Sequence, residues 1–145
     1  MNYKVYWILF FIVSSALLAG YAVGDQRADH GDPGLKGLTP LQHFGVHYAV
    51  GMFFGLVTVL AYFSITKKRS NEPLILLLSV LWSHWPDIRY VYRGGLPHDT
   101  WEVIFFFHTI VDESFGLFWI ILVLDILLIT VYRLVVIKAP PNPAL

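Results

Sequence analysis

Four long apolar runs limit the folds that this sequence can adopt. They lie near residues 5–23, 44–65, 74–85 and 115–137, and the third extends into a less apolar flank up to about residue 92. A helix needs about 20 apolar residues to cross the roughly 30 Å hydrocarbon core of a bilayer. Of the 145 residues, 57% are hydrophobic and only 14% are charged, which is not the balance of a soluble globular domain. The sequence therefore predicts an all-α integral membrane protein with four transmembrane helices in a bundle.

We expect residues 1–145 to form a single membrane domain with helices at about residues 5–24, 40–65, 72–92 and 100–137. The first run is longer than the apolar part of a usual signal peptide, so we interpret it as a membrane span. The last helix is too long to lie wholly within a bilayer. Its first part is therefore expected at the outer interface.

Basic residues favour one side of the predicted membrane. Lys67, Lys68 and Arg69 lie in the link between the second and third runs without an acidic neighbour, whereas residues 24–39 carry three aspartates. Because Lys and Arg are retained preferentially in cytoplasmic loops, both termini are predicted in the cytoplasm. The two polar outer segments would then face the outside or the periplasm from the cell (inner) membrane.

Composition excludes several kinds of site. The sequence has no cysteine, which rules out disulfides, thiolate metal sites and cysteine nucleophiles. The net charge is zero, and no basic stripe indicates nucleic-acid binding. A metal ion would have to be bound by His, Asp and Glu, which suits zinc or another divalent transition metal.

The second helix has a clear predicted start. Thr39 and Gln42 fit a capping box with Pro40 at the first helical position. His43 and His47 then fall in the first two turns, at the outer membrane face.

Two glycines continue the face on which these histidines lie. Gly51 and Gly55 follow His47 at four-residue steps, and a G-x-x-x-G pair lets membrane helices approach closely. We therefore expect His43 and His47 to face the bundle rather than lipid.

A stretch dense in polar residues runs from His84 to Glu113. Pro86 is expected to end or kink the third helix and to leave Asp87 at its outer end. With the predicted topology, seven potential metal ligands lie at one membrane depth. Two pairs among them, His43/His47 and His108/Asp112, have the i,i+4 spacing of helical metal motifs. The alternative is that these are interfacial polar residues that anchor helix ends. The seven residues are His43, His47, His84, Asp87, His98, His108 and Asp112.

Three motifs resemble those of a known family. The order Q-H-F-G-V-H-Y-A-V-G, W-P-D-I-R and F-F-H-T-I-V-D-E, within about residues 39–120, resembles the membrane-bound metal-dependent hydrolases, which are small multispanning bacterial and archaeal proteins. The helical His, Pro-Asp and H-x-x-x-D elements of these motifs are also similar to those that bind zinc in the zinc-dependent phospholipase C and single-strand nuclease superfamily. The resemblance implies a hydrolase that uses one or two metal ions on a lipid headgroup or another phosphoester at the outer membrane face. It implies His47, Asp87, His108 and Asp112 as ligands, with His43, His84 and His98 as further ligands or supporting groups.

Four charged residues would complete such a site. Glu113 or Asp99 could serve as the general base, and Arg89 and Arg93 could clamp a phosphate. For the two arginines, an equally good interpretation is that they reach toward lipid headgroups at the membrane edge.

Asp125 lies near the centre of the last apolar run, where a charge is costly. It is expected to face the interior and to serve packing or subunit contact. Ser14 and Ser15 lie at a similar depth and are its candidate partners if the carboxyl is protonated. Besides membrane lipids, other membrane subunits or a second copy of the chain are therefore candidate partners, through Asp125 and the aromatic surface.

Two other functions remain open from the sequence. A haem-binding electron carrier could draw axial ligands from His47, His84 and His108. A non-catalytic subunit of a larger membrane complex would also explain the aromatic surface.

Overall fold

The computed structural model describes residues 3–28, 39–92 and 115–137. Within these ranges the chain forms four α-helices and no strand, which confirms the predicted all-helical class. The helices are α1 (Tyr3–Ala28), α2 (Pro40–Thr66), α3 (Glu72–Tyr92) and α5 (Phe115–Tyr132), and a short π-helix, η2 (Arg133–Ile137), continues α5.

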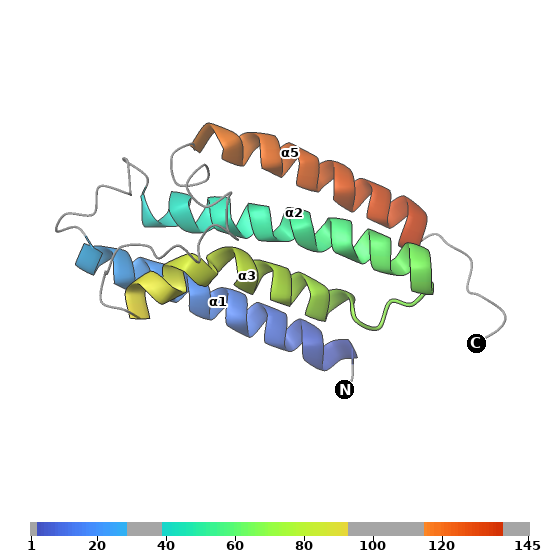
Figure 1. Cartoon of the computed structure of the whole chain (residues 1–145), viewed down its shortest axis with the longest axis horizontal. Helices are drawn as coiled ribbons and strands as arrows, with labels where there is room; N and C mark the ends of the chain where they lie inside the picture. The colour runs from blue at the N-terminus through green and yellow to red at the C-terminus, as the bar shows by residue number, and fades with distance from the viewer. Residues whose placement is uncertain (1–2, 29–38, 93–114, 138–145) are drawn as a thin grey trace.

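The helices pack side by side into an elongated bundle (Figure 1). Helix α2 lies between α3 and α5, and α1 packs on α3 and α2. Helices α2 and α5 run in one direction, and α1 and α3 run in the other. The starts of α2 and α5 therefore share one end of the bundle with the C-terminal ends of α1 and α3.

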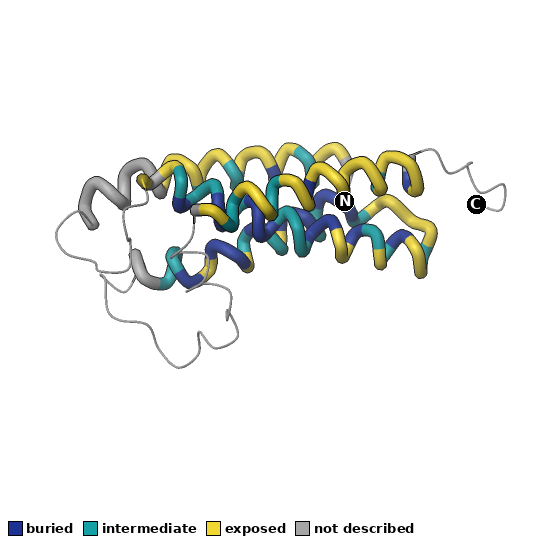
Figure 2. Tube along the Cα trace, turned by 90° about the horizontal axis from the view of Figure 1, so that it is seen from above, coloured by how far each residue is buried: buried dark blue, intermediate teal, exposed yellow. Residues whose placement is uncertain are grey.

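Two of the described helices are long and apolar enough to cross a membrane. These stretches are Leu41–Thr66 and Gly116–Val136, and the apolar part of α1, Lys4–Gly20, is shorter. Exposed apolar residues occur along α1 and α5, such as Phe11 at 63% and Ile120 at 61% exposed. Figure 2 shows many exposed positions, in yellow, along the outside of the bundle. Apolar surface of this extent is unfavourable in water and favours association with a membrane. The four spans and the cytoplasmic termini stay predictions.

The capping box at the start of α2 is confirmed. The backbone N–H of Gln42 donates to Thr39 Oγ1 at 3.3 Å, and the backbone N–H of Thr39 donates to Gln42 Oε1 at 2.9 Å. These bonds satisfy two backbone donors that a helix start leaves without intrahelical partners. They fix where α2 begins and thus the register of His43 and His47.

The close approach of α2 and α3 at the two glycines is also confirmed. A Cβ added to Gly51 would lie 2.7 Å from Val80 Cα, and one added to Gly55 would lie 3.0 Å from Leu76 Cδ2. The backbones therefore touch where a larger residue would hold them apart. Val80 is completely buried at this contact.

Pro86 does not end α3. The helix continues through it to Tyr92. A proline inside a helix removes one backbone hydrogen bond, and in membrane helices neighbouring groups often compensate for that loss. An end or a kink was expected at Pro86, and the end is wrong because α3 continues beyond Pro86 and carries Asp87.

A polar cluster ties the opposite end of the bundle together. Glu72 is only 1% exposed, and its carboxylate accepts hydrogen bonds from Arg69 Nε at 3.2 Å and from the Tyr132 hydroxyl at 2.7 Å. Burial acts to lower the pKa of Arg69, but the Glu72 carboxylate and Tyr132 act to raise it, and the net shift is upward. The cluster links the end of α5 to the start of α3.

Asp125 faces the bundle as expected and is 6% exposed. Its Oδ1 atom has no hydrogen-bond partner among the described residues. Ser14, which the sequence suggested as its partner, instead lies 3.4 Å from the Tyr48 hydroxyl.

Replacing Gly51 by Ala is expected to destabilise the protein by about 1–3 kcal/mol, because overpacking forces backbone to move. Gly20→Ala is the matched control, since an added Cβ there meets nothing within 4 Å. It is expected to be neutral or to stabilise the helix by up to about 1 kcal/mol. Unfolding titrations in detergent give both values, and equal stabilities for the two variants would contradict the close contact.

Candidate metal centre

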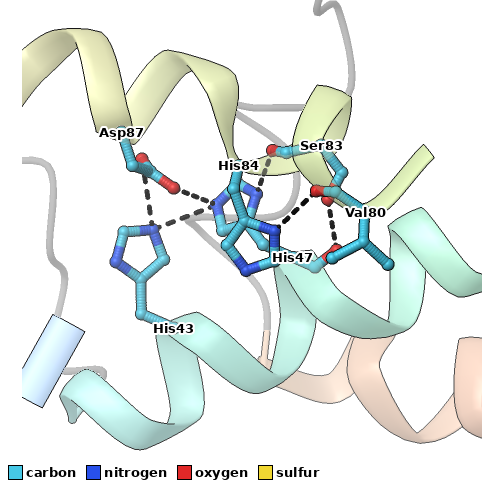
Figure 3. A network of polar contacts seen from close by, with 6 residues as sticks. All are labelled: His43, His47, Val80, Ser83, His84 and Asp87. Atoms are coloured by element: carbon cyan, nitrogen blue, oxygen red, sulfur yellow. Dashed lines mark hydrogen bonds and ion pairs between the residues drawn. The ribbon is translucent and has the colours of Figure 1, made fainter. Parts of the chain in front are cut away.

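The candidate centre lies between the start of α2 and the last turns of α3. His43 and His47 are one helical turn apart on α2, so both rings project from the same face. Asp87 projects toward them from α3, as Figure 3 shows. The Gly51 contact, one turn further along α2, holds the two helices close enough for these side chains to meet.

The three side chains place their ligand atoms around one point. His43 Nε2 lies 3.1 Å from His47 Nε2 and 3.7 Å from Asp87 Oδ1, and His47 Nε2 lies 3.3 Å from Asp87 Oδ2. One ligand atom from each residue can be chosen so that all lie within 4.8 Å of one another. Ligands placed tetrahedrally at about 2.0–2.2 Å from zinc are about 3.3–3.6 Å apart. The observed spacing therefore suits one small divalent cation.

The centre is largely shielded from solvent. His43 is 8% exposed and His47 is 2% exposed, and the Asp87 side chain is 13% exposed. Attraction between a carboxylate and a cation is stronger in such surroundings than in water. A carboxylate with two imidazoles is also a donor set that zinc and other divalent transition metals accept.

A hydrogen bond on the far side of the His47 ring decides which nitrogen can bind a metal. His47 Nδ1 lies 2.9 Å from the backbone oxygen of Ser83. Because a carbonyl oxygen can only accept, Nδ1 carries the hydrogen and Nε2 of the neutral ring carries the lone pair. Metal-binding histidines commonly have this arrangement. The lone pair of His47 is thus directed toward His43 and Asp87.

His84 lies beside the three ligands and outside the group that can share a cation. It is fully buried, and its Nδ1 donates to the Val80 carbonyl at 2.8 Å. Its ring packs against Phe44, at 5.3 Å between ring centroids, and against His47, at 5.7 Å. In this position His84 supports the ring of His47 from one side.

The described residues bring together three of the seven predicted ligands. Arg89 lies half-buried on α3, two residues beyond Asp87. The other predicted site residues lie outside the described residues, so their predicted roles stay predictions. They are Arg93, His98, Asp99, His108, Asp112 and Glu113.

Sequence reasoning missed the contribution of Ser83. Its hydroxyl donates to the His47 carbonyl, and its own carbonyl accepts from the His47 ring. Ser83 lies four residues before Asp87, on the face of α3 that meets α2. That spacing is the signal that could have drawn attention to it.

Comparison with known proteins finds no matching protein family, no similar curated protein and no similar solved structure. The resemblance to membrane-bound metal-dependent hydrolases therefore stays a prediction. What supports a metal centre is the geometry of His43, His47 and Asp87.

Zinc binding is expected to stabilise the fold, because the ion would cross-link α2 and α3. A ligand at 100 times its dissociation constant stabilises the protein that binds it by about 2.7 kcal/mol. Thermal unfolding with and without Zn²⁺ measures the effect. Asp87→Ala is expected to abolish it, whereas His30→Ala, which changes a histidine outside the predicted ligand set, is expected to retain it. A shift that survives in Asp87→Ala would place the metal elsewhere.

Proposed function

We propose that the protein is a metal-dependent hydrolase that acts on a phosphoester of a lipid headgroup. The observation that carries this proposal is the convergence of His43, His47 and Asp87 at one end of an apolar helix bundle. Among the described residues, two imidazoles and one carboxylate come together, and catalytic zinc sites use three such protein ligands with water in the fourth position. A metal held only for structure more often has four protein ligands.

The chemistry of such a donor set suits hydrolysis. A metal ion bound there would lower the pKa of water and polarise a phosphoryl oxygen. Asp87 would supply negative charge to hold the ion, and the Ser83 carbonyl would keep the His47 ring oriented. Arg89, two residues beyond Asp87 on α3, is the one of the two arginines predicted to clamp a phosphate that the structure describes.

The position of the centre in the bundle supports a lipid substrate. His43 and His47 lie in the first two turns of α2, whose apolar stretch begins at Leu41. If that stretch crosses a bilayer, the centre lies at the depth of the headgroups. Exposed apolar residues nearby, such as Leu41 at 67% and Trp85 at 48% exposed, would meet the acyl chains.

The haem alternative would take its axial ligands from His47, His84 and His108, of which the structure describes the first two. His47 Nε2, the nitrogen that a haem iron would bind, lies 3.1 Å from His43 Nε2 and 3.3 Å from the Asp87 carboxylate. A hydrolytic metal uses both the histidines and the carboxylate, and a haem would leave Asp87 without a role.

Hydrolysis can be tested with the purified full chain in phospholipid vesicles. Release of water-soluble phosphorylated headgroup is expected in the presence of Zn²⁺ or Mn²⁺ and is expected to stop after treatment with a chelator. Asp87→Ala is expected to lower turnover at least 100-fold, in line with the loss of a group that holds a catalytic metal. Gly20→Ala serves as the control with full activity. Release that is insensitive to the chelator and to Asp87→Ala would refute the proposal.

A further inference from the structure

Ser83 contacts the candidate centre from behind the His47 ring, away from the other ligands. We propose that Ser83 is a positioning residue that fixes the orientation and the tautomer of His47. This inference rests on the proposed metal binding, because its consequence is the presentation of His47 Nε2 to a cation.

Two hydrogen bonds join the same two residues in opposite senses. The His47 ring donates from Nδ1 to the Ser83 backbone oxygen at 2.9 Å, and the Ser83 hydroxyl donates to the His47 backbone oxygen. The bond from the Ser83 hydroxyl holds Ser83 against the α2 backbone, and the bond from the His47 ring holds that ring against the α3 backbone. Both residues are buried, at 2% exposed for His47 and 6% exposed for Ser83. Water cannot readily replace either bond there.

The missing side chain of Gly51 makes this pairing feasible. A Cβ at Gly51 would lie 3.2 Å from Ser83 Oγ and 2.7 Å from Val80 Cα. The Ser83 hydroxyl can thus reach the α2 backbone only because residue 51 is glycine. The hydroxyl in turn holds the Ser83 carbonyl at hydrogen-bonding distance from the His47 ring.

Loss of the hydroxyl is expected to loosen this arrangement without removing a ligand. The Ser83 carbonyl would still be present, but α3 would no longer be tied to the α2 backbone at that point. The His47 ring could then rotate or exchange its ring hydrogen between Nδ1 and Nε2. Removal of a partner that orients a metal-binding histidine typically lowers metal affinity about 10–100-fold.

The experiment compares Ser83→Thr with Ser83→Val in the full chain in detergent micelles. Thr and Val have nearly the same shape, so any cost of extra volume is shared and the pair differs only in the hydroxyl. The Zn²⁺ dissociation constant, measured by competition with a chelating dye, is expected to be about 10–100-fold higher for Ser83→Val. Ser79→Ala is the control, because it removes a hydroxyl from the same α2–α3 interface beside Gly55. It is expected to bind Zn²⁺ like the wild type.

A spectroscopic readout separates positioning from general stability. Nitrogen-15 chemical shifts report which nitrogen of His47 carries the hydrogen. They are expected to show an Nδ1 hydrogen in the wild type and in Ser83→Thr, and a mixture of tautomers in Ser83→Val. If neither bulkier variant folds, Ser83→Ala, which adds no volume, is compared with the wild type in the same two measurements.

Equal Zn²⁺ affinities and identical His47 shifts with and without the hydroxyl would overturn the role of Ser83. Failure of the wild type to bind Zn²⁺ would instead refute the proposed function. The two failures are therefore distinguishable.

Discussion

Helices α2 and α3 are in backbone contact at Gly51, and the geometry of the candidate centre depends on this contact. With no side chain at residue 51, α3 approaches until Val80 Cα is within 2.7 Å of where a Cβ would be. One turn away, this approach lets the Ser83 hydroxyl reach the α2 backbone, and it places Asp87 against His43 and His47. A wider spacing between the helices would separate the carboxylate from the imidazoles.

Apart from Asp125 and the Ser14–Tyr48 contact, the buried polar groups of the described residues gather near the two ends of the bundle. At one end the Asp87 carboxylate lies 3.3 Å from His47 Nε2, which is 3.1 Å from His43 Nε2, and at the other end Arg69 and Tyr132 donate hydrogen bonds to the buried Glu72 carboxylate. Between the ends, apolar packing holds the helices together. Buried polar groups are costly unless they are hydrogen-bonded or paired, so both clusters also help to fix the register of the helices.

Much of the fold could be predicted because the deciding signals are local. The capping box at Thr39 and the spacing of Gly51 and Gly55 are short patterns with a direct structural meaning. Pro86 can either end or kink a helix, and its local preference did not decide between the two, whereas the structure continues α3 through it to Tyr92. In the same way, Ser14 was suggested as a partner for Asp125 from depth alone, but its contact is with Tyr48 on the neighbouring helix.

The candidate site was only partly predictable, because ligand spacing depends on how two helices meet. The i,i+4 spacing of His43 and His47 indicated one half of the centre, and membrane depth suggested Asp87. The hydrogen bonds between His47 and Ser83 depend on tertiary contact, and the i,i+4 spacing of Ser83 and Asp87 does not by itself show them.

The central claim is that His43, His47 and Asp87 bind one divalent metal ion. X-ray absorption at the zinc edge of the zinc-loaded full chain tests it most directly. We predict scattering from two imidazole rings and at least one carboxylate oxygen at about 2.0–2.2 Å from zinc, with the imidazole signal reduced in His47→Ala. Coordination by oxygen alone, or a spectrum unchanged in His47→Ala, would contradict the claim.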